Sequence, residues 1–187
     1  MEDTLIFVDD GFFGLVKKHF QKEDGKPNKY LQTFRNICKK ENFNLKHLFV
    51  YTAPPYQSPN QTEREAFLMS RYQNMTKMLR KKRWITLREG RCQKYINEKG
   101  KEDFCQKGVD ALVIMDMYDI KENYPEIKKI ILIASDSVPV IKRMKQKGFK
   151  IIIYTYFDRK RKSKFSTSNQ LLKIASKWVK LNKEDFL

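Results

Sequence analysis

Four apolar runs constrain the fold of this chain more than any other feature of its sequence. They read TLIFV, LKHLFVYT, KKIILIA and FKIIIYTYF, and they begin at Thr4, Leu45, Lys128 and Phe149. Each is the length of a strand and too short for a membrane span. The segments with helical spacing between them are 12–20, 30–41, 62–81 and 139–147. Apolar strands that alternate with helices are typical of a parallel sheet covered on both faces, so we expect an α/β fold.

Local signals support several element ends. Thr62 and Glu65 form a capping-box pattern at the start of the helix 62–81, and Gly148 is placed to end the helix 139–147. The other expected elements are a hairpin with basic edges over 83–101, centred near Gly90, a buried helix over 108–120, a final helix over 169–178 and a short strand over 179–181. A chain of 187 residues is expected to form one domain, 1–187, with the basic hairpin as an insertion around 77–104.

The charge of the chain concerns its partners more than its fold. The formal net charge is +17, from 39 Lys and Arg against 22 Asp and Glu. Phosphate polymers are the natural counter-charge, although a surface that is simply rich in lysine is the alternative. Three cysteines without a C-x-x-C pair, an acidic start and the lack of a long apolar run predict a reduced, cytoplasmic protein without a membrane partner. The sequence leaves a homodimer open.

Acidic side chains follow two of the expected strands. Asp9 and Asp10 come directly after the first strand, and Asp136 follows the strand that begins at Lys128. The carboxyl ends of parallel strands meet at one edge of a sheet, where ligands collect. Asp110 opens the helix 108–120, and Asp116 lies six residues further on, about 120° around the helix and about 9 Å along its axis. Those two carboxylates cannot both bind one ion without other ligands.

Several carboxylates at one point repel each other unless a cation joins them. Oxygen ligands suit Mg²⁺ or Mn²⁺, which can activate water and neutralise a phosphoryl oxygen. The alternative is that Asp10, Asp110 and Asp136 are helix N-caps, a common role for Asp before an apolar helical pattern.

The segments IFVDDGFF, KGVDALVIMDM, LIASDSVPVIKRMKQKGFKIIIYTY and SNQLLKIASKWVKL, in this order, resemble the NYN domain of the LabA-like group within the PIN-like nuclease superfamily. The resemblance runs from about residue 4 to residue 181. It implies a Rossmann-like, PIN-like three-layer sandwich around a mainly parallel sheet, and metal-dependent cleavage of RNA. It also implies that Asp9, Asp110, Asp116 and Asp136 are metal ligands, and that Ser168, before the last helix, faces the site.

The chain departs from the family pattern at the site. Asp10 stands where a Gly usually follows the first Asp, Phe12 replaces an Asn or Tyr, and Ser135 replaces a Gly. Aligning Pro139 with the family's Pro leaves the second Asp and the Phe of the turn missing, so one expected carboxylate is absent. Asp10 is a candidate to replace it.

A basic stretch over 77–95 surrounds Trp84 and Tyr95. Lysine and arginine meet phosphates, and exposed aromatic rings stack on unpaired bases. Trp84 as part of the core is the alternative. The candidate nucleic-acid contacts are Lys81, Lys82, Arg83, Trp84, Arg88, Arg91, Lys107, Arg159, Lys160, Arg161 and Ser168.

Two functions follow from these features. The first is a metal-dependent endoribonuclease in which Asp9, Asp110 and Asp136 are catalytic and hold Mg²⁺ or Mn²⁺ with help from Asp10 and Asp116. The second is a non-catalytic protein, binding single-stranded or structured RNA or acting as a scaffold, with a degenerate nuclease site. A phosphoacceptor receiver domain is disfavoured, because an acceptor Asp ending the third strand and a late-strand Lys cannot both be placed, and because the chain is strongly basic.

Overall fold

The computed structural model describes residues 1–24, 30–135, 138–158, 165 and 167–186. A six-stranded sheet runs through this part of the chain in the order β3-β2-β1-β6-β7-β8, and every neighbouring pair is parallel. Its strands are β1 (Glu2–Asp9), β2 (Phe43–Thr52), β3 (Ile85–Glu89), β6 (Lys129–Ile133), β7 (Lys150–Thr155) and β8 (Lys177–Lys180). The strand order reverses between β1 and β6, which places a topological switch point at the carboxyl end of β1.

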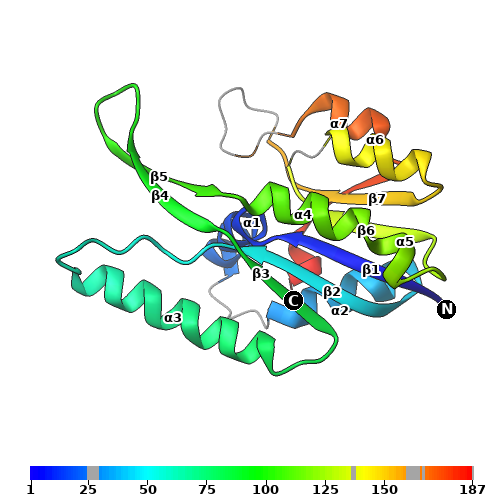
Figure 1. The fold of residues 1–187 in the computed structure, drawn as a ribbon, viewed down its shortest axis with the longest axis horizontal. Coiled ribbons are helices and arrows are strands. Elements are labelled where there is room, and N and C mark those ends of the chain that lie inside the picture. Colours follow the sequence, from blue (N-terminus) through cyan, green and yellow to red (C-terminus); the bar gives the residue numbers. More distant parts are fainter. Residues whose placement is uncertain (25–29, 136–137, 159–164, 166, 187) are drawn as a thin grey trace.

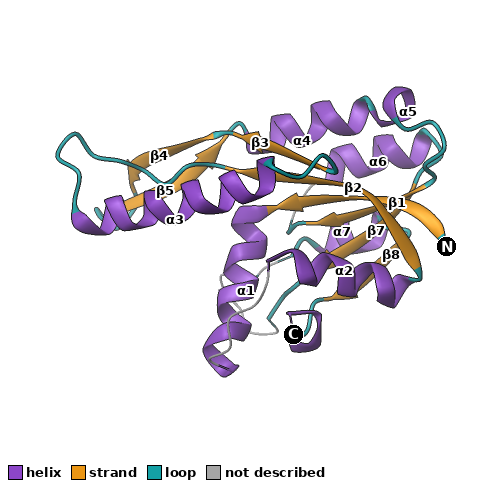
Figure 2. Ribbon diagram, turned by 90° about the horizontal axis from the view of Figure 1, so that it is seen from below, coloured by secondary structure: helices purple, strands orange, loops and turns teal. Residues whose placement is uncertain are grey.

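Helices cover both faces of the sheet (Figures 1 and 2). One face carries α1 (Asp10–Asp24), α2 (Tyr30–Glu41), α3 (Glu63–Arg80) and the 3₁₀ helix η1 (Lys183–Phe186). The other carries α4 (Val109–Tyr118), α5 (Ile120–Asn123), α6 (Val138–Gln146) and α7 (Asn169–Ile174). The expected α/β sandwich around a parallel sheet is therefore confirmed.

The two sides of β1 belong to two different cores. Ile6 and Val8 pack on the side of α1 and α2, in a cluster with Phe13. Leu5 and Phe7 pack on the side of α4, where the ring of Phe7 stacks on Phe49 with 4.5 Å between centroids. Both clusters are fully buried at these strand positions, so the register of β1 decides the face on which each later side chain lies.

Several expected ends are confirmed. The helix over 30–41 has those bounds, and α3 begins with the reciprocal capping box of Thr62 and Glu65. Gly148 adopts a φ of 93°, and the N–H of Phe149 bonds the carbonyl of Met144 across it, which closes α6.

The expected hairpin around Gly90 is wrong in its position. Ile85–Glu89 is instead a parallel strand beside β2, with Ile85 and Leu87 directed to the core. The hairpin consists of β4 (Arg91–Ile96) and β5 (Glu102–Lys107), and its turn covers 97–101. Gly90 continues the β2–β3 pairing, since its N–H bonds the carbonyl of Thr52 at 2.8 Å. Together with α3, the hairpin projects from one end of the molecule (Figures 1 and 2).

Two further expectations need correction. The helix over 108–120 is α4, and it is buried on one side only: Val109, Val113 and Met117 face the core, while Ile114 and Met115 are exposed. The final helix ends at Ile174 rather than at residue 178, because 177–180 pairs with β7 as β8. No helix in the part of the chain described here has the length and apolar character needed to cross a membrane.

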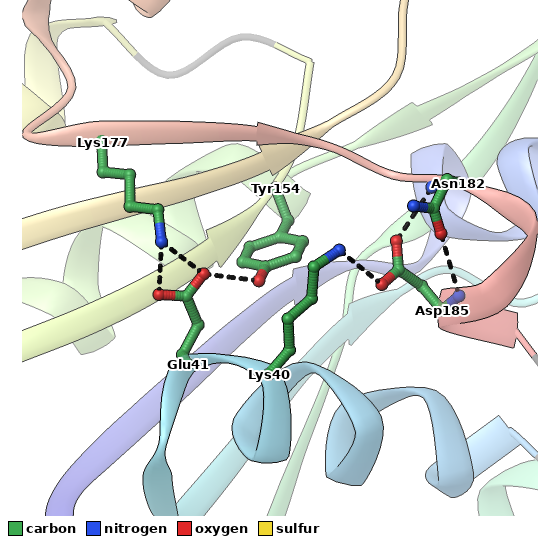
Figure 3. Close-up of polar contacts among 6 residues, drawn as sticks. All are labelled: Lys40, Glu41, Tyr154, Lys177, Asn182 and Asp185. Carbon is green, nitrogen blue, oxygen red and sulfur yellow. Dashed lines mark hydrogen bonds and ion pairs between the residues drawn. The ribbon is translucent and has the colours of Figure 1, made fainter.

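Polar contacts attach the carboxyl-terminal segment to α2 (Figure 3). Glu41 accepts hydrogen bonds from the Tyr154 hydroxyl at 2.8 Å and from Lys177 Nζ at 2.7 and 2.8 Å. Next to it, Asp185 accepts from Lys40 at 3.2 Å and from the backbone N–H of Asn182 at 2.8 Å. The side chains of Glu41 and Asp185 are 7% and 4% exposed, so these contacts connect α2, β7, β8 and η1 in a shielded position.

The Glu41 contact predicts a measurable contribution to stability. We expect Glu41→Gln to lower the free energy of unfolding by about 1–2 kcal/mol, because the charged hydrogen bond to Lys177 is lost while Lys177 remains half exposed and partly screened. Urea unfolding measures this. Glu126→Gln is the matched control, since Glu126 pairs with Lys46 at 3.7 Å and is 49% exposed; it should change stability by less than about 0.5 kcal/mol. Equal effects of the two variants would contradict the assigned role.

Candidate functional site

Asp9 and Asp10 end β1 and begin α1, and they lie on opposite sides of the sheet. Asp9 continues the side of Leu5 and Phe7, which faces α4. Asp10 follows the side of Ile6 and Val8, which faces α1 and α2. Adjacent residues at a strand end diverge in this way because side chains alternate along a strand. The two carboxylates therefore have different neighbours.

Asp9 shares its side of the sheet edge with Asp110. Its Oδ1 accepts the backbone N–H of Phe12 at 3.1 Å, which fixes the orientation of the carboxylate. Burial raises the pKa of Asp9; the N–H groups of Phe12 and Gly11 lower it in part, and the neighbouring charge of Asp110 raises it again. Among the described residues, no lysine or arginine forms an ion pair with Asp9 or Asp110. Asp9 is thus a shielded carboxylate without a cationic partner at the switch point, and the charge of the exposed Asp110 acts on it.

The local chain path explains how Asp110 reaches this edge. Gly108 precedes α4 with a φ of 80°, a conformation that glycine adopts without strain. It turns the chain from β5 into α4 so that the first turn of the helix, with Asp110, lies at the carboxyl ends of the strands. Gly108 has no side chain to cap the helix, and Asp110 is inside the helix rather than at its N-cap, so the cap interpretation of Asp110 is wrong.

Asp10 is held by two hydroxyl groups. Tyr30 donates to its Oδ1 at 2.8 Å and Thr52 donates to its Oδ2 at 3.1 Å. Burial raises the pKa of Asp10, while these two hydrogen bonds and the charge of Lys17 lower it in part. Because both oxygens are engaged on the α1–α2 side, the structure gives no support to Asp10 as a replacement for the missing ligand of the turn.

Asp116 has a complete set of partners of its own. Arg88 donates to it from Nε at 3.0 Å and from Nη2 at 2.8 Å, and the Tyr51 hydroxyl donates at 3.0 Å. The side chain of Asp116 is 10% exposed, and its hydrogen bond is the main reason that the pKa of Arg88 is raised. The sequence assigned Asp116 to the metal and Arg88 to nucleic acid; the structure pairs them with each other.

The expected cluster of five carboxylates is not assembled by the described residues. In the part of the chain that the structure describes, no three His, Cys, Asp or Glu side chains lie close enough together to hold a metal ion. Asp136 lies outside the described residues, so its position relative to Asp9 and Asp110 stays a prediction. Among the predicted ligands on the α4 side, Asp110 is the one whose charge acts on Asp9.

The candidate nucleic-acid contacts differ in their exposure. Lys81, Arg83, Arg91 and Lys107 are exposed, and Lys82 is half buried. Trp84 packs partly buried against the core of the α1–α2 side, which favours the alternative interpretation of this residue. Ser168 precedes α7 without capping it through its side chain. Arg159, Lys160 and Arg161 lie outside the described residues.

Exposed aromatic rings occur on the hairpin instead of at Trp84. Tyr95 is 41% exposed and Phe104 is 51% exposed, although Phe104 also touches Tyr56 with 5.4 Å between ring centroids. Lys94 lies 5.9 Å from the centre of the Tyr56 ring. The sequence interpretation included residues 91–96 in an arm of the hairpin, but it paired them across Gly90 and missed their partner strand, β5.

A search with family models and a search of curated proteins found no match to the chain. The likeness to NYN domains therefore stays a prediction that depends on the motifs in the sequence.

Gly90 connects β3 to β4 and packs closely against the start of α4. A Cβ at this position would overlap the backbone oxygen of Lys107 and lie 2.9 Å from Cγ2 of Val109. We expect Gly90→Ala to lower the free energy of unfolding by about 1–3 kcal/mol, the usual effect of an added methyl group in a packed site. Chemical denaturation checks this.

Gly14 is the matched control for Gly90. It lies in α1, and a Cβ there would meet nothing within 4 Å. Gly14→Ala should therefore stabilise the protein by about 0.5–1 kcal/mol, because alanine loses less backbone freedom in a helix. A Gly90→Ala variant that is as stable as the Gly14→Ala variant would show that the connection between β3 and β4 is not tightly packed.

Proposed function

We propose that the protein is a metal-dependent endoribonuclease of the NYN type, and that Asp9 and Asp110 form the described part of its catalytic centre. The observation that supports this is the uncompensated carboxylate pair at the switch point of the sheet, in a chain with a net charge of +17. The burial of Asp9 and the repulsion between the two carboxylates are unfavourable by themselves, and they are explained if a cation and a polyanion complete the site.

The donor atoms fit Mg²⁺ or Mn²⁺. Both ions prefer carboxylate oxygens, and Mg²⁺ is commonly bound by one or two carboxylates together with water and substrate phosphate. Asp9 and Asp110 would hold the ion, and the sequence resemblance adds Asp136. Such an ion supplies a more acidic water molecule and neutralises charge on the phosphoryl group. Asp116 is left out of the proposed ligands because Arg88 already neutralises it.

The residues of the chain have separate tasks in this proposal. The N–H of Phe12 holds the Asp9 carboxylate in one orientation. Burial and the charge of Asp110 raise the pKa of Asp9, and a cation bound between the two carboxylates would oppose this and keep both ionised. Arg91 and Lys107, exposed and paired across the base of the hairpin, would contact phosphates of the RNA, while Tyr95 and Phe104 offer rings for stacking. The three free cysteines agree with a reducing, cytoplasmic setting.

A second function is favoured by a different observation. The ion pair between Arg88 and Asp116 removes one expected carboxylate from the site, and the sequence lacks the second Asp of the turn. A protein that binds RNA without cleaving it would keep the basic surface and lose the metal. Isothermal titration with Mn²⁺ separates the two functions, because a degenerate site should show no saturable binding that depends on Asp9.

The nuclease proposal predicts that Asp9→Asn and Asp110→Asn each reduce Mn²⁺-dependent RNA cleavage on the order of 10²-fold or more, since each removes a charge that holds the metal. Cleavage of a labelled RNA measures this. Mn²⁺ should also raise the melting temperature of the unchanged protein and not of the two variants.

Asp116→Asn is the control for these variants. It breaks the pair with Arg88 and is expected to leave cleavage and the Mn²⁺ effect within a few-fold of the unchanged protein, because Asp116 is not a ligand in the proposal. Cleavage that survives in Asp9→Asn would reject the mechanism. Loss of cleavage in Asp116→Asn, with the fold retained by circular dichroism, would instead support the larger carboxylate set of the sequence interpretation.

A further inference from the structure

A second charged site lies across the sheet from Asp9 and Asp110. It is a pocket of about 510 Å³ between α1 and α3, lined in part by Lys17, Lys18 and Arg71, with Asp10 and Tyr30 also on its wall. Its volume falls within the range of about 300–1,000 Å³ that is usual for small-molecule sites. None of these residues was singled out as a basic candidate from the sequence, because Lys17 and Arg71 are far apart along the chain.

The three basic side chains have no acidic partner at ion-pair distance among the described residues. Lys17 rests over the ring of Tyr30, with Nζ 5.6 Å from its centre, and Arg71 lies near Phe67. Burial lowers the pKa of Lys17; the charge of Asp10 opposes this and the charge of Arg71 adds to it. Like charges from two helices thus converge on one pocket.

Asp10 does not neutralise this group. It supplies one carboxylate against three cations, and its oxygens accept hydrogen bonds from Tyr30 and Thr52. The pocket therefore keeps an excess of positive charge even when Asp10 is ionised. A single anion with close to two negative charges would balance it.

We propose that this pocket binds a phosphomonoester, with Arg71, Lys17 and Lys18 around the phosphate oxygens. Phosphomonoesters carry about −1.5 to −2 charges at neutral pH and three acceptor oxygens, whereas an internal phosphodiester carries one charge. Arginine offers a paired donor geometry for phosphate, and lysine adds a point charge. A nucleoside monophosphate and a phosphorylated RNA end share this chemistry. The proposal does not depend on the nuclease activity, because the pocket and the Asp9–Asp110 pair use different side chains.

The test is a binding titration of the full chain in EDTA and at fixed ionic strength, so that a divalent-metal site is silent. The probes are inorganic phosphate, AMP, and one short RNA with either a 5′-phosphate or a 5′-hydroxyl. We expect the 5′-phosphorylated RNA to bind about tenfold or more tightly than its 5′-hydroxyl form, since charged hydrogen bonds to phosphate are lost in the latter. Binding of AMP with no preference between the two RNAs would assign the pocket to a free nucleotide.

Two variants of α3 separate the pocket from general surface charge. Arg71→Ala should weaken binding of AMP and of the phosphorylated RNA about tenfold. Arg64→Ala removes the same charge from the same helix outside the pocket and should change binding by less than about twofold. Asp10→Asn should strengthen binding, because it removes a negative charge from the wall of the pocket.

Three results would overturn the proposal. One is equal weakening by Arg71→Ala and Arg64→Ala, which indicates a diffuse basic surface. Another is the absence of saturable binding of every phosphomonoester probe to the folded protein. The last is weaker binding by Asp10→Asn when circular dichroism shows an intact fold, since a variant with less negative charge in the pocket should attract the phosphate more strongly.

Discussion

The alternation of side chains along β1 decides how the charged residues of this protein are distributed. β1 is buried on both faces, with Ile6 and Val8 in one core and Leu5 and Phe7 in the other, so its register cannot slip by one residue without exposing an apolar row. The two residues at its end must then diverge. One of them joins the α4 side and the other joins the α1–α2 side, and every later contact of Asp9 and Asp10 follows from this separation.

The separation produces two sites of opposite charge around one turn of the chain. On the α4 side, the charge of Asp110 acts on Asp9, and no described basic residue forms an ion pair with either of them. On the other side, Asp10 lies in a pocket where Lys17, Lys18 and Arg71 outnumber it. Elsewhere the described carboxylates of low exposure are matched locally, as Glu41 is by Lys177 and Tyr154. The imbalance is thus concentrated at the switch point, where open parallel sheets bind ligands.

The fold was more accessible from the sequence than the site. Apolar periodicity identifies β1, β2, β6 and β7 because burial on both faces leaves little choice of residue. It misplaces the hairpin, since Gly90 is not in a hairpin turn. Gly90 connects β3 to β4, where the backbone passes close to Lys107 and Val109. The sequence also cannot show that Arg88 lies beside Asp116, because that contact joins residues of β3 and α4 through the tertiary structure. A carboxylate can be found from sequence, but its partner usually cannot.

The acid at position 10 illustrates this limit. From the motif alone, Asp10 is one more carboxylate at the correct edge of the sheet and a natural substitute for a missing ligand. In the structure, Asp10 is next to Asp9 in sequence but does not share its site. Its oxygens accept hydrogen bonds from Tyr30 and Thr52 on the α1–α2 side of the sheet. There it connects the start of α1 to α2 and β2 and reduces the positive charge of the pocket. The alternation of side chains along a strand therefore decides on which face of the sheet a residue at the strand end lies. A residue next to a catalytic residue in sequence can belong to a different site on the opposite face.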